Sequence, residues 1–200
     1  HLLQANIREM ALDWLAAGID PQRSIMFVQS HVPEIAELFT YMGMTTPMGW
    51  LTRVPTFKEK VRMHPDNVNY GLLGYPVLMA SDIILYKADT VPVGEDQLPH
   101  LELTREIVRR FNSIFGEVFP EPKAKLTEIP LIVGLDGSAK MSKSMDNQID
   151  LAVSDEETLK RVKTAFTDPT RVRKNDPGHP DKCNVYTLHG AFTTSVFPEK

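Results

Sequence analysis

The 200-residue sequence contains a single cysteine, Cys183, which excludes a framework of internal disulfides and is compatible with a reducing compartment. It has no apolar run long enough to span a bilayer, and its N-terminal segment lacks the charged head and apolar core of a signal peptide. Internal repeats and low-complexity segments are also absent. These absences exclude a disulfide scaffold and a membrane-spanning protein, and they predict a soluble globular protein of the cytoplasm.

An excess of positive charge is lacking too, since 22 lysines and arginines face 26 aspartates and glutamates, for a net charge of −4. Such a protein is not expected to bind nucleic acid indiscriminately, so any contact with RNA should be local. Basic residues do gather between Lys160 and Lys174, where they form either a solvated face or a contact with an RNA backbone. His179, Cys183 and His189 lack the paired spacing of metal ligands, and we predict no metal centre.

The hydrophobic content of 42% allows a sizeable core, and apolar runs alternate with helical patterns. Compact apolar runs at 24–30, 90–94 and 129–134 suit buried parallel strands. Helical spacing of apolar residues predicts a helix before Gly18 and others over about 33–42, 75–86, 96–111 and 154–166, with Pro76 in a first turn. This alternation predicts an α/β fold with a parallel sheet.

Prolines and glycines break the pattern between residues 43 and 74, which indicates an insertion at about 33–74 with a short helix near Phe57. This segment has more apolar residues than a solvent-exposed insertion needs. They either pack on the main body or form a partner surface, and a homodimer interface is plausible. The residues concerned are Met42, Met44, Met48, Trp50, Leu51 and Phe57.

The segment Lys140-Met141-Ser142-Lys143-Ser144 places two lysines three residues apart among hydroxyls, directly after a predicted strand. Lysine ammonium groups and serine hydroxyls can neutralise charge on a departing pyrophosphate. Ligands of open α/β sheets bind beyond the carboxyl ends of strands, where this loop would lie. On its own, however, the string is more typical of a solvated loop than of a phosphate-binding segment.

Asp82 stands within the most apolar helix, where spacings of three and four place it on one face with Tyr75, Met79 and Tyr86. A carboxylate in that setting needs a donor. One interpretation is an internal salt bridge or hydrogen bond. The other is a flat apolar ligand with one donor, such as an indole with its N–H group.

Gly94-Glu95-Asp96-Gln97 forms a turn from a strand into a helix, with Asp96 as the predicted helix cap. Such a turn can approach a phosphate or ribose, because its glycine admits close contact and the helix N-terminus offers free N–H groups. A simple capping turn explains the string about as well. His100 in the first helical turn is predicted to be a surface residue without a role.

Taken together, these residues resemble the class I aminoacyl-tRNA synthetases, and within them the bacterial-type tryptophanyl-tRNA synthetases. The resemblance covers nearly the whole chain and runs through Gly18-Ile19-Asp20-Pro21, Phe27-Val28-Gln29-Ser30, Gly71-Leu72-Leu73-Gly74-Tyr75-Pro76, Met79-Ala80-Ser81-Asp82-Ile83, Val91-Pro92-Val93-Gly94-Glu95-Asp96-Gln97, His100-Leu101-Glu102-Leu103-Thr104-Arg105 and Lys140-Met141-Ser142-Lys143-Ser144. Tyrosyl-tRNA synthetases also place an aspartate on the equivalent helix. They typically have glutamine where Met79 stands and a Gly-Gly-x-Asp-Gln turn, so Met79 and Glu95 favour tryptophan.

The resemblance implies a Rossmann-like catalytic domain over residues 1–150 and the beginning of a helical anticodon-binding domain over 151–200. It implies ATP-dependent formation of tryptophanyl-adenylate and transfer of the amino acid to tRNA(Trp), with Mg²⁺ sharing the phosphate charge. The implied tryptophan-binding residues are Asp82 for the indole N–H, Met79, Val91 and Val93 for the ring, and Tyr75 and Gln97 for the polar end. The implied ATP-binding residues are Gly94, Glu95, Asp96, Leu131, Lys140, Met141, Ser142, Lys143 and Ser144, of which Lys140 and Lys143 act on the leaving pyrophosphate.

The family's first strand and its His-x-Gly-His-like ATP motif are not found in this sequence. The resemblance therefore predicts an internal piece of a longer synthetase that carries half of the ATP site. The iron–sulfur cysteine cluster of some relatives cannot be formed with Cys183 alone. A catalytically silent synthetase-like module with a binding or regulatory role stays open as an alternative, as does tyrosyl specificity.

Overall fold

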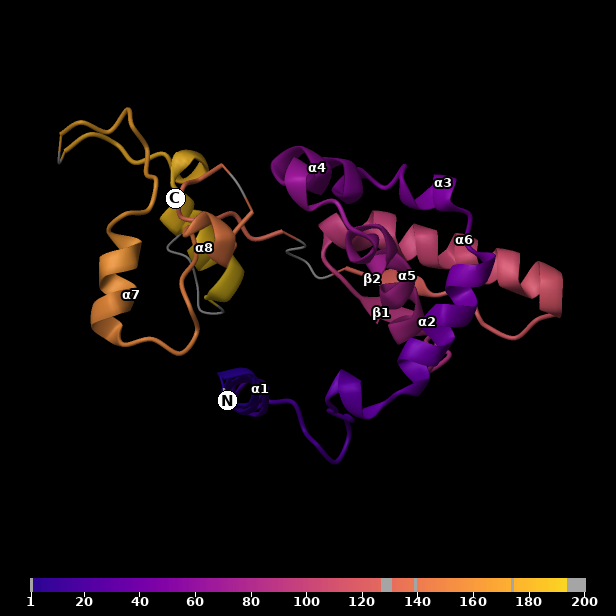
Figure 1. Ribbon diagram of the computed structural model, residues 1–200. Coiled ribbons are helices and arrows are strands. Elements are labelled where there is room, and N and C mark those ends of the chain that lie inside the picture. Colours follow the sequence, from indigo (N-terminus) through magenta and orange to yellow (C-terminus); the bar gives the residue numbers. More distant parts are fainter. Residues whose placement is uncertain (1, 127–130, 139, 174, 194–200) are drawn as a thin grey trace. The chain divides into compact units, whose positions relative to one another are not determined.

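The computed structural model of the chain describes residues 2–126, 131–138, 140–173 and 175–193 (Figure 1). The chain divides into two compact units. The first unit consists of His1–Met26 and Leu131–Lys200, and the second consists of Phe27–Pro130. Among the described helices, none is both long and apolar enough to cross a membrane.

The second unit is built around α5 (Tyr70–Ile84), which packs against α2 (Glu34–Thr45) and α6 (Leu98–Phe115). No residue of α5 from Leu72 onward is exposed, as its apolar sequence predicts. The core between these helices contains Met42, Val77, Ile84, Ile107 and Val108, each at most 1% exposed. Full burial of such side chains contributes about 1.5–3 kcal/mol each, so the contacts of α5 hold this unit together.

Helix α5 begins five residues before the predicted start, because Asn69 caps it. The Asn69 side-chain oxygen accepts a hydrogen bond from Leu72 N at 3.0 Å. Pro76 therefore lies inside the helix and not in its first turn, which corrects the prediction. Proline has no N–H group for the Leu72 carbonyl, and the all-round apolar packing of α5 compensates for that lost bond.

A strand, helix and strand follow α5 in the chain. β1 (Thr90–Pro92) leads through the 3₁₀ turn η3 (Glu95–Gln97) into α6, and β2 (Lys123–Lys125) then pairs parallel to β1. Val91 stands opposite Ala124 in this register. The structure confirms the predicted strand at 90–94 and the parallel pairing. β2 could not be predicted from the sequence, because Lys-Ala-Lys is exposed throughout and carries no apolar pattern.

The predicted strand at 24–30 was wrong, and the strand predicted at 129–134 is described only from residue 131 onward. Residues 24–28 have no ladder partner among the residues described, Ile25 is 91% exposed, and a 3₁₀ turn, η1 (Gln29–His31), follows. A strand is stabilised by its neighbours, so an apolar run without one does not adopt the ladder. Of the run at 129–134, residues 129 and 130 lie outside the described residues. The rest contributes one isolated antiparallel bridge, between Val133 and Lys140.

The segment after α2 contains α3 (Met48–Leu51), α4 (Pro55–Met63) and η2 (Pro65–Asn67), which confirms the short helix predicted near Phe57. Most of the apolar side chains singled out between Met42 and Phe57 pack on the main body. Met42 and Leu51 are buried, while Trp50 and Phe57 pack against the core. Met44 and Met48 are exposed, at 77% and 67%. The core thus explains four of the six side chains singled out in the sequence.

The first unit contains α1 (Leu2–Ala16), η4 (Lys143–Met145), α7 (Asp155–Val162), η5 (Pro180–Lys182) and α8 (Asn184–Phe192). α1 confirms the predicted N-terminal helix, and the Ser154 side chain caps α7 as its sequence indicates. α7 ends four residues before Phe166, because Phe166 N donates to Leu135 O at 2.8 Å and so leaves the helical path. The predicted domain division after residue 150 and the predicted insertion stay predictions.

Candidate functional site

The lysine-serine segment lies at the end of a short hairpin in the first unit. Val133 pairs with Lys140, and Met141 N donates to Ile132 O at 2.9 Å. The turn includes Gly137, whose φ of +73° is a conformation that glycine adopts without strain. In place of the predicted strand followed by a loop, the structure has a hairpin whose second arm begins the lysine-serine segment at Lys140 and Met141.

One buried asparagine holds the backbone of this segment. Asn147 is 4% exposed, its side-chain oxygen accepts from Ser142 N at 2.8 Å, and its amide donates to Lys140 O at 3.2 Å. The same amide also donates to Asp136 Oδ2 at 3.1 Å. Sequence reasoning missed Asn147, because nothing in the string marks a polar residue as a buried partner of the backbone.

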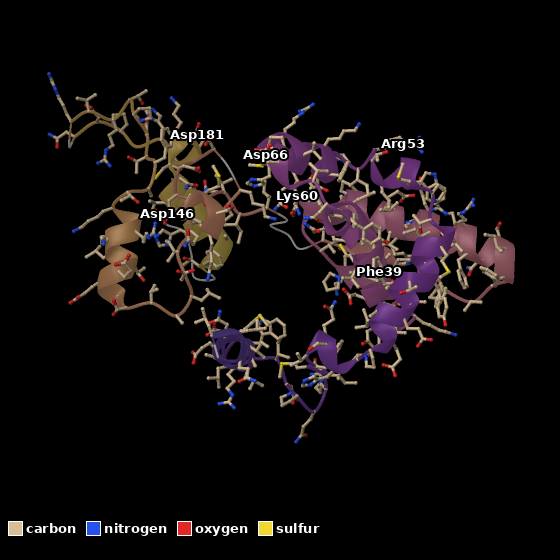
Figure 2. All side chains as sticks on the ribbon, viewed as in Figure 1. Phe39, Arg53, Lys60, Asp66, Asp146 and Asp181 are labelled. Atoms are coloured by element: carbon tan, nitrogen blue, oxygen red, sulfur yellow. The ribbon has the colours of Figure 1, made fainter. Side chains whose placement is uncertain are left out.

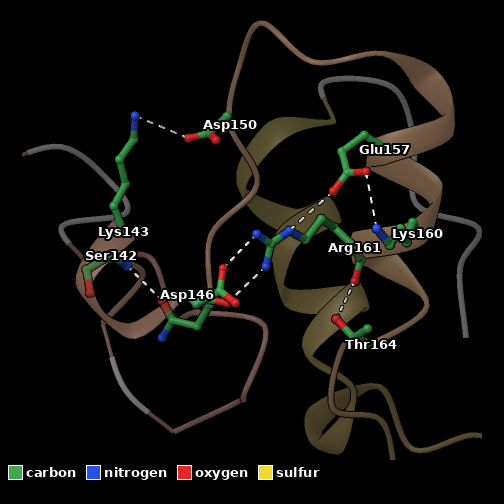
Figure 3. A network of polar contacts seen from close by, with 9 residues as sticks. Ser142, Lys143, Asp146, Asp150, Glu157, Lys160, Arg161 and Thr164 are labelled. Atoms are coloured by element: carbon green, nitrogen blue, oxygen red, sulfur yellow. Dashed lines mark hydrogen bonds and ion pairs between the residues drawn. The ribbon is translucent and has the colours of Figure 1, made fainter.

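Both lysines of the segment, Lys140 and Lys143, are exposed. Lys143 is 83% exposed, and its Nζ lies 3.5 Å from Asp150 Oδ1 (Figure 3). An ion pair this exposed contributes about 0–1 kcal/mol, so an anionic ligand can replace Asp150 at little cost. The hydroxyl oxygens of Ser142 and Ser144 lie 3.3 Å apart beside it. The segment borders an open hollow of about 490 Å³ in the first unit.

A second anchor ties the end of the segment to α7. Asp146 adopts a left-handed conformation with φ of +51°, and its carboxylate pairs with Arg161 Nη2 at 2.6 Å (Figure 3). Arg161 also donates to the Asp146 carbonyl at 3.0 Å. Leu131, the remaining predicted contact for a nucleotide in this unit, is 42% exposed just before the hairpin.

The other predicted site residues belong to the second unit, and Asp82 has a partner there that the sequence did not reveal. Gln29 Nε2 lies 2.7 Å from Asp82 Oδ1 and 2.9 Å from Oδ2. Met79, one turn before Asp82 on α5, is half-buried against the core. The structure therefore satisfies the internal hydrogen bond of the first interpretation, and the carboxylate keeps lone pairs for a further donor.

Val91 and Val93 follow from β1 and pack against the same core as Met79. Beyond them, Gln97 Nε2 donates to Asp96 Oδ2 at 2.7 Å within η3, next to Gly94 and the exposed Glu95. Asp96 does not cap α6, which corrects the prediction. The 3₁₀ turn places the carboxylate beside Gln97, the N-cap residue, instead of over the first helical N–H groups.

Tyr75 belongs to a cluster of three polar side chains. Its hydroxyl lies 3.0 Å from Thr56 Oγ1 and 3.3 Å from His100 Nε2, and Thr56 Oγ1 lies 3.1 Å from the same nitrogen. The prediction of His100 as a surface residue was wrong, because the side chain is 3% exposed. Position in a first helical turn does not reveal that α4 and α5 cover that face of α6.

Lys60 of α4, labelled in Figure 2, places its ammonium 4.3 Å from the centre of the Tyr75 ring. Burial, together with this ammonium, lowers the pKa of His100 below its ordinary value, and Asp96 opposes the shift. The imidazole is therefore neutral at neutral pH, with one donor and one acceptor nitrogen.

Comparison with known proteins gives the family. Residues 1–197 match the family described as tRNA synthetases class I (W and Y). The chain belongs to this family. A tryptophan–tRNA ligase of Thermotoga maritima is 49% identical, over 96% of this chain and 59% of its own length. One from Aquifex aeolicus is 42% identical, over 96% of this chain and 66% of its own length.

Solved structures agree with the sequence relatives. The tryptophanyl-tRNA synthetase of Campylobacter jejuni, complexed with ADP and tryptophan, matches with a TM-score of 0.79 and 40% identity, over 95% of this chain and 59% of its own. The tyrosyl-tRNA synthetase of Aeropyrum pernix, at 22% identity and a TM-score of 0.66, shares the fold alone. These matches confirm the predicted α/β class I synthetase fold and the resemblance to bacterial tryptophanyl-tRNA synthetases. The chain spans 59–66% of the two ligases named above.

Replacing Gly134 with alanine should destabilise this synthetase chain. A Cβ atom at Gly134 would lie 2.9 Å from Asn147 Cβ and 2.1 Å from Asn147 Nδ2, so the residue that holds the lysine-serine segment must move. Overpacking of this kind costs about 1–3 kcal/mol, measured as the free energy of unfolding in urea. Gly178→Ala is the control, because no atom lies within 4 Å of its added Cβ. Equal effects of the two variants would contradict the tight contact.

Acidification should reduce stability through His100. Its pKa is lowered by folding, so below the ordinary value of 6.5 the unfolded chain takes up a proton that the folded chain does not bind. Between pH 7.5 and 5.5 the wild type should lose up to about 1.4 kcal/mol more unfolding free energy than His100→Gln, which cannot titrate there.

Asp168 also changes its pKa on folding, but it does not titrate between pH 7.5 and 5.5. Hydrogen bonds from Thr170 and His179 lower its pKa to about 2. Its stabilising effect is lost only as the pH falls below about 4. Identical pH dependence in the wild type and His100→Gln would show that His100 does not titrate differently in the folded chain.

Proposed function

We propose that the protein to which this chain belongs is a tryptophan–tRNA ligase, which activates L-tryptophan with ATP and transfers it to tRNA(Trp). The observation that carries the proposal is the carboxylate of Asp82, held by Gln29 on an otherwise apolar face of α5. Relatives named as tryptophan–tRNA ligases at 42–49% identity support it, as does the structural neighbour complexed with ADP and tryptophan.

In this proposal Asp82 accepts a hydrogen bond from the indole N–H group. Gln29 uses two of the roughly four lone-pair positions of the carboxylate, which leaves acceptor capacity for the ligand. Met79, Val91 and Val93 line the ring, which suits their half-buried positions against the core. A site built to receive an N–H donor discriminates strongly against ligands that lack one, because the acceptor positions that Gln29 leaves open on the carboxylate would then stay unpaired.

Tyr75 and Gln97 hold the polar end of the amino acid, while Gly94, Glu95, Asp96 and the backbone at Leu131 meet ATP. Lys140, Met141, Ser142, Lys143 and Ser144 take the phosphates, with Lys140 and Lys143 acting on the leaving group. The exposed ammonium of Lys143 and the neighbouring hydroxyls of Ser142 and Ser144 support this assignment, since charge-assisted donors are the strong ligands of phosphate oxygens.

The reaction needs little acid–base catalysis. A carboxylate oxygen of tryptophan forms a bond to the α-phosphorus, the bond from that phosphorus to the bridging oxygen breaks, and pyrophosphate leaves with the electron pair. The lysines stabilise the negative charge that develops on the leaving group. A terminal hydroxyl of tRNA then attacks the aminoacyl carbonyl, and AMP leaves. Positioning and charge stabilisation supply most of the rate enhancement in such chemistry.

The residues described do not form a magnesium site of their own, since no group of three His, Cys, Asp or Glu side chains is placed to hold an ion there. Mg²⁺ commonly keeps several waters and is bound through the phosphates of its nucleotide. We therefore infer that it arrives with ATP, and we assign no step of the reaction to it.

The proposal extends to location and assembly. Aminoacylation serves translation, which places the protein in the cytoplasm. Met44 of α2 and Met48 of α3 are exposed and are candidates for a homodimer interface. Residues 151–200, with α7 and α8, would begin the helical anticodon-binding domain, in which the basic sequence between Lys160 and Lys174 would contact RNA phosphates.

Replacing Lys143 with alanine tests the assignment of the phosphate-binding segment. Tryptophan-dependent exchange of pyrophosphate into ATP, measured on the full-length protein, should fall by about 10²–10³-fold, because a preorganised positive charge on the leaving group is lost. The affinity for tryptophan should not change. Lys58→Ala, an exposed lysine of α4, is the matched control. A Lys143→Ala variant with wild-type exchange would remove this residue from the reaction.

A further inference from the structure

The cluster of Thr56, Tyr75 and His100 contains two residues to which the proposed function assigns no role. It joins three elements, because Thr56 comes from α4, Tyr75 from α5 and His100 from α6. All three polar atoms lie within 3.0–3.3 Å of one another. The rings of Tyr75 and His100 also meet edge to face, with centroids 5.4 Å apart, which restricts rotation of the phenol.

The hydrogen bonds of this cluster fix where the protons lie. His100 Nδ1 is buried and has no hydrogen-bond partner in the part of the chain that the structure describes. A buried N–H group without an acceptor is rarer than a buried acceptor without a donor, so the ring proton belongs on Nε2. Nε2–H then donates to the hydroxyl oxygens of Thr56 and Tyr75. The hydrogen bond between the Thr56 and Tyr75 oxygens needs a hydrogen from only one of the two hydroxyl groups.

The Tyr75 hydroxyl can therefore donate its hydrogen to Thr56 while its oxygen accepts a hydrogen bond from His100 Nε2–H. Its oxygen has two lone pairs, and the cluster occupies only one of them. The Lys60 ammonium, 4.3 Å from the phenol ring centre, adds positive charge that disfavours protonation of the nearby imidazole. The cluster thus keeps the phenolic oxygen as an acceptor for a ligand that brings a donor.

We propose that His100 is a positioning residue that, with Thr56, orients the Tyr75 hydroxyl to accept a hydrogen bond from the α-ammonium group of the amino-acid substrate. This inference rests on the proposed function, in which Tyr75 holds the polar end of tryptophan. It explains why the Tyr75 hydroxyl donates to Thr56 and presents its oxygen as an acceptor. His100 and Thr56 thereby take part in amino-acid selection without direct contact with the substrate.

Two substitutions at His100 test the inference, because they place a side-chain N–H donor at the position of either Nε2 or Nδ1. The amide nitrogen of glutamine reaches the position of Nε2, whereas that of asparagine reaches the position of Nδ1. Calorimetric binding to the full-length protein should show that His100→Asn weakens L-tryptophan about tenfold, the effect of one hydrogen bond to a charged group, and that His100→Gln restores most of the affinity. Indole-3-propionate, which has the ring and carboxylate but no ammonium group, should bind both variants as it binds the wild type.

The two ligands separate positioning from general damage. If His100 only supports the fold, His100→Asn will weaken both ligands equally, and the inference fails. It also fails if His100→Gln loses L-tryptophan binding as severely as His100→Asn. A wild-type protein that does not bind L-tryptophan would overturn the proposed function, and this inference with it.

Thr56 provides a second test that does not depend on the folding of the histidine variants. Thr56→Val keeps the shape of the side chain and removes its hydroxyl, whereas Thr56→Ser keeps the hydroxyl. Thr56→Val should weaken L-tryptophan several-fold and leave indole-3-propionate unchanged, and Thr56→Ser should bind both ligands as the wild type does. Equal losses for Thr56→Val and Thr56→Ser would contradict the proposed orientation of the Tyr75 hydroxyl.

Discussion

The hydrogen bond between Gln29 and Asp82 is the interaction on which the rest of the account depends. A carboxylate on an apolar helix face is costly unless a donor meets it, and Gln29 Nε2 meets both oxygens at 2.7 and 2.9 Å. The bond connects two segments of the second unit that are 53 residues apart in sequence. It also leaves one charged acceptor next to Met79, on the helix that the core surrounds. Because α2 and α6 pack against α5, this helix holds the acceptor in a fixed position. A surface loop would not position it as precisely.

The same arrangement recurs in both units: a buried polar side chain holds a group to which the proposed function gives a role. In the first unit Asn147 holds the backbone of Lys140 and Ser142, so the lysine side chains extend from a fixed base while remaining solvated. In the second unit His100 and Thr56 hold the Tyr75 hydroxyl. Buried polar groups of this kind must be satisfied, and satisfaction fixes their geometry. The side chains of Tyr75, Lys140 and Lys143 are more exposed than those of His100 and Asn147.

Sequence patterns predicted the elements whose stability comes from apolar spacing, namely α1, α2, α5, α6, α7 and β1. They failed where secondary structure depends on pairing with a neighbouring strand. Residues 24–28 are apolar but have no ladder partner among the described residues, whereas the polar β2 becomes a strand because β1 lies beside it. Site residues followed the same rule. Asp82 was recognisable as a carboxylate in an apolar helix, but Gln29, Asn147 and His100 became visible only with the structure, since their importance lies in contacts across 5 to 53 residues of sequence.

The claim that Asp82 selects the indole N–H group can be tested most directly with a ligand that lacks only that group. In 3-benzothienyl-L-alanine a sulfur atom replaces the N–H of tryptophan and leaves the ring shape almost unchanged. Calorimetry on the full-length wild type should give an affinity for L-tryptophan at least about tenfold higher, as expected for a hydrogen bond to a charged acceptor, and the difference should vanish in Asp82→Ala. Equal affinity of the wild type for the two ligands would contradict the assignment of Asp82 to the indole.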